Sequence, residues 1–184
     1  MCVPEFGLIN SGETELDTRL GLVAPASFAL RAVRHMAEFG TTPEQLAQVA
    51  AKNRSHASHN PFAQFRNPLT ISEVLESPMI VDPLTRFQCC PIADGAAAAV
   101  VCSPTLAERI GRAVNVEAAI LCTGSYENPQ DLARWETDLR CVHLAYEKSG
   151  IGPEDLDVIE CHDAFTISEI LHYESLGLCE AGIL

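Results

Sequence analysis

The residues that could do chemistry lie mostly in one short stretch, residues 157–165. Its apolar start, after a turn, is typical of a buried strand, and a helical pattern begins at Thr166. His162 therefore lies where a predicted strand gives way to a helix, a common place for ligands in α/β proteins. An imidazole there could donate a hydrogen bond to a developing oxyanion or move a proton. It could equally be a buried, hydrogen-bonded structural histidine, and position alone does not decide.

The aspartate that follows, Asp163, is expected to play a different part. Neighbouring residues on a strand point to opposite faces, so Asp163 is badly placed to orient His162. An aspartate just before a helix is a good N-cap, and we expect Asp163 to cap the helix that follows.

Other candidate residues carry weaker signals. Cys89 and Cys90 precede a proline and have no helix start or cationic neighbour, so they are expected to be structural rather than nucleophilic. His56 and His59 could share a metal, but no third ligand is apparent. Because no Cys-x-x-Cys pair occurs either, we expect no metal site. Five basic residues could meet phosphate groups or simply form a solvated loop: Lys52, Arg54, His56, His59 and Arg66.

Composition narrows the class of protein. The chain has 184 residues, 47% hydrophobic and 20% charged, and a formal net charge of −13. So acidic a chain is not expected to bind nucleic acid or a membrane surface generally, since both need a basic face. Its longest apolar run, residues 96–102, is too short to span a bilayer. No secretory signal is visible, so the eight cysteines are expected to be reduced thiols in a cytoplasmic protein.

The remaining pattern predicts the elements that must position these residues. Helices are expected over residues 25–39, from the capping box at Thr42, from a second capping box at Thr70, and over 104–110, 139–149 and 166–176. Strands are expected at 96–102, 114–123 and 158–161, while 52–67 and 82–95 are expected to be loops. Strands alternating with helices indicate an α/β fold.

Four blocks of sequence together resemble one known family. They are residues 60–66, the strongest block at 84–99, residues 145–150, and residues 157–165 continued by 169–179. These resemble the sterol-carrier-protein-type, or lipid-transfer-protein-like, thiolases, in the family's order, from about residue 21 to residue 179.

The resemblance implies a layered α/β/α/β/α fold, incomplete in this chain. Residues 1–111 would be the end of the N-terminal half with its inserted loop region, and 112–184 the start of the C-terminal half. Such proteins are usually dimeric and cleave or form 3-oxoacyl-CoA thioesters through an acyl-cysteine. An acyl-CoA or steroid-CoA thioester would be the ligand. Coenzyme A would be a substrate, with no further cofactor, and the partner would be a second copy or another thiolase-like chain.

The resemblance also implies roles for two residues. Many thiolases carry an Asn-Glu-Ala-Phe motif whose asparagine serves an oxyanion hole; this family has histidine there, matching His162-Asp163-Ala164-Phe165. His162 would be the oxyanion donor and Phe165 a wall of the pantetheine and acyl channel.

The sequence departs from the family in what it lacks. No Gly-His-Pro occurs, and the resemblance does not reach the early nucleophilic cysteine or the late acid/base cysteine. The chain is therefore expected to be inactive alone. One alternative is a non-catalytic protein that binds an acyl-CoA or steroid-CoA or docks on another thiolase-like chain. A weaker alternative is a steroid side-chain aldolase.

Overall fold

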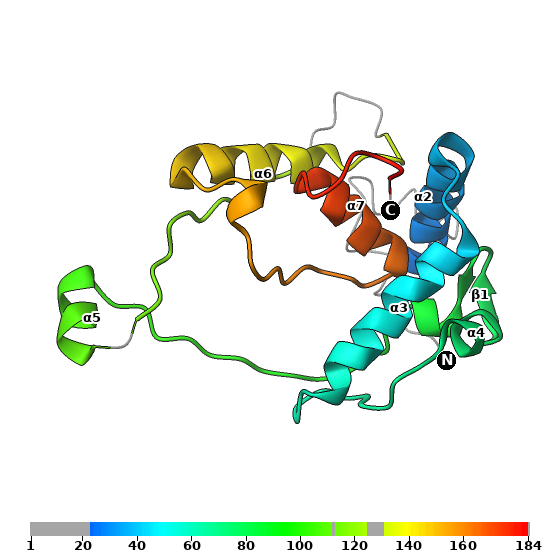
Figure 1. Ribbon diagram of the computed structural model, residues 1–184, viewed down its shortest axis with the longest axis horizontal. Coiled ribbons are helices and arrows are strands. Elements are labelled where there is room, and N and C mark those ends of the chain that lie inside the picture. Colours follow the sequence, from blue (N-terminus) through cyan, green and yellow to red (C-terminus); the bar gives the residue numbers. More distant parts are fainter. Residues whose placement is uncertain (1–22, 112, 125–130, 184) are drawn as a thin grey trace.

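The computed structural model describes residues 23–111, 113–124 and 131–183 of the chain (Figure 1). The structured elements, in chain order, are α2 (Ala24–Phe39), α3 (Pro43–Ser58), α4 (Ile71–Leu75), β1 (Met79–Val81), β2 (Leu84–Thr85), the 3-10 turn η2 (Arg86–Gln88), α5 (Pro104–Ile110), α6 (Glu136–Ser149), the 3-10 turn η3 (Pro153–Asp155) and α7 (Thr166–Ser175).

The predicted helices are confirmed, although α6 begins at Glu136, three residues before its predicted start. α2 ends at Gly40 with φ of 76°, a left-handed conformation that glycine adopts without strain. α3 starts with a reciprocal capping box between Thr42 and Gln45, and α4 starts with one between Thr70 and Glu73. The prediction of a polar loop from residue 52 is wrong for residues 52–58, which continue α3. That stretch contains no proline or glycine to stop the helix.

The core forms where α7 packs against α2 and α3 (Figure 1). α7 contributes Ile167, Ile170 and Leu171, which are almost fully buried against apolar residues of the other two helices and of β2: Phe28, Ala29, Ala32, Leu46, Val49 and Leu84. A smaller cluster joins α3 to α4. The core thus combines residues from both predicted parts of the chain, and the boundary at residue 111 stays a prediction.

The predicted strands are not formed as strands. Residues 96–102 and 113–123 are extended but have no ladder partner, and α5 lies between them at the far end of a projecting arm (Figure 1). Within the described ranges, the only sheet is the antiparallel pair β1–β2. The expected tight packing is also absent, since Val100 is 97% and Leu121 96% exposed. A strand needs a neighbour to satisfy its backbone, and these segments have none here.

Residues 157–161 depart from expectation in the same way. They are extended but unpaired, and Val158 is 82% exposed rather than buried. The expected α/β layering is therefore incomplete in this chain, with the helices and one small sheet in place. No helix of the described residues is long and apolar enough to cross a membrane.

Candidate functional site

His162 lies at the end of the extended segment, three residues before the helix cap of α7. The cap is Phe165, which has an extended conformation and makes no side-chain cap hydrogen bond. The expectation that Asp163 caps this helix is therefore wrong. Instead, the Asp163 carboxylate accepts a hydrogen bond from Asn53 of α3, with 2.7 Å between Nδ2 and Oδ2.

The imidazole of His162 is exposed, and within the described residues its ring makes no hydrogen bond or ion pair. Its backbone is held, because His172 Nε2 lies 3.2 Å from the His162 carbonyl oxygen. The reading of His162 as a buried, hydrogen-bonded structural histidine is therefore contradicted. A free ring on a fixed backbone can offer its hydrogen-bond donor to a ligand.

Beside this segment lies a buried carboxylate, Glu169, that sequence reasoning missed. Its side chain receives Lys52 Nζ at 2.7 Å and Asn53 Nδ2 at 2.6 Å, and it also accepts the Tyr173 hydroxyl. Burial opposes ionisation of Glu169, but the hydrogen bonds from Lys52, Tyr173 and Asn53 outweigh it and lower the pKa of the carboxyl. Burial and the neighbouring Glu169 raise the pKa of Tyr173. Asn53 thus joins the Glu169 carboxylate to Asp163, the neighbour of His162.

His172 of α7 contacts the backbone of His162, whereas Asn53 of α3 contacts the side chain of Asp163. His172 Nδ1 lies 2.5 Å from Asp138 Oδ2 of α6, and the His172 ring stacks on Trp135 with centroids 5.3 Å apart. Burial works to lower the pKa of His172, but Asp138 and the His162 carbonyl outweigh it, so this pKa is raised.

No local signal marks Glu169 or His172 in the sequence. Glu169 lies off the apolar stripe of α7 and would be read as solvent-facing, whereas α3 covers it.

Phe165 lies in the core. It is 5% exposed and stacks on Phe28 of α2, with ring centroids 4.4 Å apart. Its predicted role as a channel wall stays a prediction. The residue before it, Ala164, accepts a hydrogen bond from the backbone N–H of Cys90 at 2.8 Å, which brings the Cys89–Cys90 pair to this segment.

The cysteines beside the segment are not poised as nucleophiles. Burial raises the pKa of Cys89 and that of Cys161 to about 11 each, and it also raises the pKa of Cys90. A thiol with a raised pKa is rarely a thiolate at neutral pH, so these groups fit the structural role expected of Cys89 and Cys90.

The basic residues around α3 are partly engaged. Lys52 pairs with Glu169, and the Arg54 guanidinium lies over the rings of Phe65 and Phe87, at 4.6 and 5.7 Å from their centroids. His56 and His59 are exposed, and the described ranges contain no group of three or more His, Cys, Asp or Glu that could hold a metal ion. A phosphate contact in this region remains a hypothesis.

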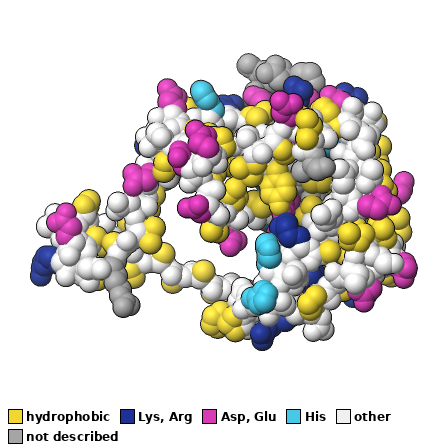
Figure 2. Space-filling model, viewed as in Figure 1, with side chains coloured by type: hydrophobic (Ala, Val, Ile, Leu, Met, Phe, Trp, Pro, Cys, Tyr) yellow, Lys and Arg dark blue, Asp and Glu magenta, His cyan; other side chains and the backbone are white. Residues whose placement is uncertain are grey.

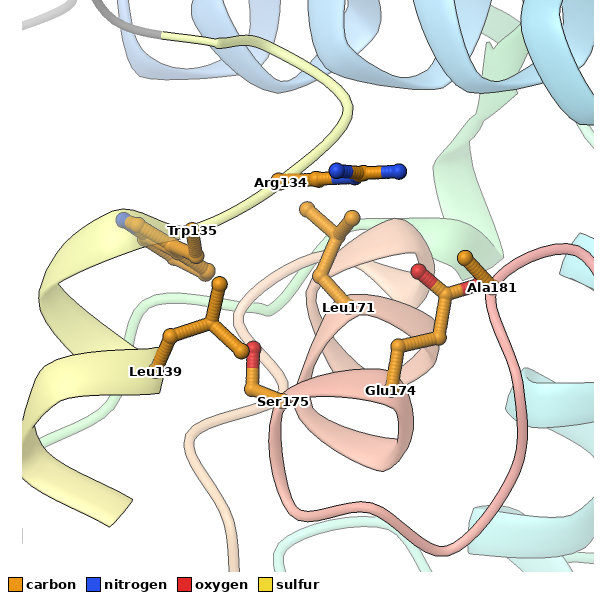
Figure 3. Close-up of a pocket in the computed structure, with 7 residues that line it drawn as sticks. All are labelled: Arg134, Trp135, Leu139, Leu171, Glu174, Ser175 and Ala181. Carbon is orange, nitrogen blue, oxygen red and sulfur yellow. The ribbon is translucent and has the colours of Figure 1, made fainter. Parts of the chain in front are cut away.

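A pocket of about 190 Å³ lies between α6, α7 and the C-terminal segment (Figure 3). Trp135 and Leu139 face Leu171 and Ser175 across it, and Arg134, Glu174 and Ala181 complete its lining. Neither His162 nor Phe165 lines this pocket. It reaches their surroundings through Leu171, which shares a core cluster with Phe165, and through Trp135, which stacks on His172.

Comparison with known proteins shows what this chain is similar to. Residues 123–183 match the family described as "Thiolase C-terminal domain-like". The chain is 44% identical over 172 residues to "Benzoylsuccinyl-CoA thiolase subunit BbsB" of Thauera aromatica, covering 92% of this chain and 45% of that protein. It is 38% identical over 168 residues to "Sterol carrier protein 2" of Homo sapiens, covering 87% of this chain and 31% of that protein.

A solved structure gives the same picture. The structure titled "Ltp2-ChsH2(DUF35) aldolase" superposes with a TM-score of 0.79 and 28% identity, covering 95% of this chain and 49% of that one. The similarity thus extends over nearly the whole chain, which spans about half or less of the length of these relatives. The resemblance seen in the sequence, and the incomplete thiolase-like fold it implies, are confirmed.

Proposed function

We propose that this thiolase-like chain, homologous to thiolases and to sterol carrier protein 2 over most of its length, supplies the oxyanion-stabilising wall of an acyl-CoA site. His162 is the donor in this proposal. The observation that carries it is the free imidazole of His162 on a backbone held by His172 and, through Asp163, by Asn53.

The chemistry needs such a donor at one atom. When a 3-oxoacyl-CoA is cleaved, the bond between C2 and C3 breaks and its electron pair moves onto the thioester as an enolate. The acyl group passes to a cysteine sulfur, and the enolate takes a proton at C2. A fixed N–H aimed at the enolate oxygen stabilises this charge by about 3 kcal/mol, or on the order of 100-fold in rate.

The nucleophile and the acid/base groups are not supplied by this wall. Cys89, Cys90 and Cys161 have raised pKa values, and no Gly-His-Pro occurs among the 184 residues. Covalent catalysis needs a nucleophile, a base and an oxyanion hole in one place. In this proposal a complementary thiolase-like chain brings the first two, and the present chain alone binds a CoA thioester without turnover.

Acetoacetyl-CoA tests the role of His162 without any nucleophile, because its enolate absorbs in the ultraviolet. A donor worth about 3 kcal/mol lowers the apparent pKa of bound acetoacetyl-CoA by about 2 units. We expect enolate absorbance at neutral pH with the unchanged chain and its loss in His162→Ala.

The matched control is His143→Ala, since His143 is an exposed histidine on α6. It should bind and ionise acetoacetyl-CoA as the unchanged chain does. An equal enolate signal in His162→Ala, or no binding of acetoacetyl-CoA by the unchanged chain, would remove His162 from the proposal. Thiolysis by the chain alone would remove the need for a complementary chain.

A second candidate function is aldol cleavage of a 3-hydroxyacyl-CoA. It is favoured by the likeness to the structure titled as an aldolase, and by the raised pKa values of Cys89 and Cys161, described thiols near His162. Aldol cleavage leaves the same thioester enolate but needs no acyl-cysteine. Cleavage of a 3-hydroxyacyl-CoA without added coenzyme A, in an assembly with a partner chain, would support it over thiolysis.

A further inference from the structure

The imidazole of His172 lies between two hydrogen-bond acceptors. Its Nδ1 is 2.5 Å from the Asp138 carboxylate, and its Nε2 is 3.2 Å from the carbonyl oxygen of His162. A neutral imidazole has a single N–H and an imidazolium ion has two. Both contacts are therefore satisfied together only when His172 is protonated.

The surroundings of His172 fix which contact is lost on deprotonation. Asp138 on α6 is a charged acceptor and binds an N–H more strongly than a neutral carbonyl does. The remaining proton therefore stays on Nδ1, and the lone pair of Nε2 then faces the His162 carbonyl oxygen. Two lone pairs facing each other repel, so the held carbonyl is released.

Charged groups from every element packed nearby take part in this balance. Asp138 comes from α6, and Glu169 from α7 itself, where Lys52 of α3 pairs with it. Arg31 of α2 interacts electrostatically with Asp138 and lies 5.0 Å from the centre of the Trp135 ring on which His172 stacks. The acidic neighbours favour the imidazolium form, and Lys52 and Arg31 moderate them.

We propose that His172, clamped as an imidazolium ion between Asp138 and the His162 carbonyl, is a positioning residue that makes the placement of His162 depend on pH. The clamp itself stands on the geometry of α6, α7 and residue 162. Its consequence for a ligand rests on the proposed function of His162.

The direction of the pH effect follows from the cited shift. The pKa of His172 is raised above its ordinary value of 6.5. The clamp is therefore fully present below pH 6.5 and is lost as the pH rises through the raised pKa. The order of the His162 backbone is expected to follow the same course.

The sequence makes the test unusually direct. Of the six histidines, His162 is the only one followed by aspartate. Labelling the chain with carbonyl-¹³C histidine and ¹⁵N aspartate therefore marks a single peptide bond in nuclear magnetic resonance spectra. We expect the His162 carbonyl shift to titrate with the same midpoint as the Cε1 signal of the His172 ring.

Asp138→Asn keeps the shape of the acceptor but removes its charge, so both midpoints should move together to lower pH. His172→Asn should abolish the titration of the His162 carbonyl, and the control His143→Asn should leave it unchanged. A His162 carbonyl that stays flat while His172 titrates would overturn the proposal, as would a midpoint unmoved in Asp138→Asn. The titration of the unchanged chain decides the matter even if a variant fails to fold.

Failure of this proposal and failure of the proposed function are distinguishable. The titration of the His162 carbonyl needs no ligand, so it tests the contact with His172 independently of the proposed function. With acetoacetyl-CoA, the advantage of the unchanged chain over His162→Ala should fall from about 100-fold toward unity as His172 loses its proton. Equal enolate signals in both at every pH would refute the function of His162 while leaving the clamp in place.

Discussion

Residues of the same type differ here in what the fold does to them. His162 keeps a free ring, whereas His172, ten residues later, uses both ring nitrogens. An imidazole whose two nitrogens both have protein partners can hold a backbone segment in place but has no donor left for a ligand. An imidazole without protein partners can donate to a ligand but does not hold the backbone. Glu169 is 2% exposed, and its pKa is lowered against the effect of burial because Lys52 and Asn53 of α3 and Tyr173 of α7 donate to it. The candidate site thus depends on polar contacts buried beneath it rather than on its own exposed residues.

We expect Lys52→Met to lower the free energy of unfolding at pH 7 by about 1–3 kcal/mol, because it removes one of the donors to a buried carboxylate. The pKa of Glu169 is lowered, so the stability it contributes is present above its ordinary value of 4.5 and is lost as the pH falls through the lowered value. The cost of Lys52→Met should shrink over that same range. Urea unfolding at several pH values measures this.

Lys148→Met is the matched control, since Lys148 is an exposed lysine on α6. It should change the free energy of unfolding by less than about 0.5 kcal/mol. A pH-independent cost of Lys52→Met would mean that lost packing, rather than the pairing with Glu169, sets the effect.

Three helices place the site. α7 begins three residues after Asp163 and carries Glu169 and His172. α3 carries Lys52 and Asn53, and α6 carries Asp138. α7 packs against both of the other helices, so the segment at residues 162–163 is held from two directions. Displacing α3 should therefore disturb Asp163 first, through Asn53.

We expect Thr42→Ala to destabilise the chain by about 1 kcal/mol, because it breaks the capping box that starts α3. Thr105→Ala, at an exposed position in the first turn of α5, is the control and should cost less than about 0.5 kcal/mol. Urea unfolding monitored by circular dichroism compares the two. Equal costs would mean that the Thr42 cap does not stabilise α3 in the folded chain.

At the scale of the whole molecule, the main feature is the projecting arm, which consists of residues 96–111, including α5, and residues 113–123 (Figure 1). Residues 96–102 and 113–123 present apolar side chains and unpaired backbone to solvent, and Figure 2 shows hydrophobic atoms along the projecting part. Such a surface favours association, because extended apolar segments add readily to another sheet. The proposed complementary chain would satisfy these segments as neighbouring strands and so complete the layered fold.

In the absence of such a chain, we expect the 184-residue polypeptide to associate with itself. Changing Val100 and Leu121 together to aspartate should reduce this association, because charge opposes burial of the arm. Sedimentation velocity measures it. The control Gln48→Asp with Asn60→Asp adds the same charge at two exposed positions outside the arm. A monomeric unchanged chain with a sharp unfolding transition would contradict the expectation.

The sequence by itself determined the features set by short-range rules. Caps and glycine stops located the helices, and the histidine motif located His162 and the family, because each depends on residues a few positions apart. The tertiary structure decided which side chains meet. Asn53 and Asp163 are 110 positions apart, and no local pattern pairs them. The tertiary structure also left the ring of His162 without a protein partner among the described residues and placed His172 between Asp138 and the His162 carbonyl oxygen. The strand predictions at residues 96–102 and 114–123 failed for the same reason, because a strand is completed by a distant neighbour rather than by its own residues.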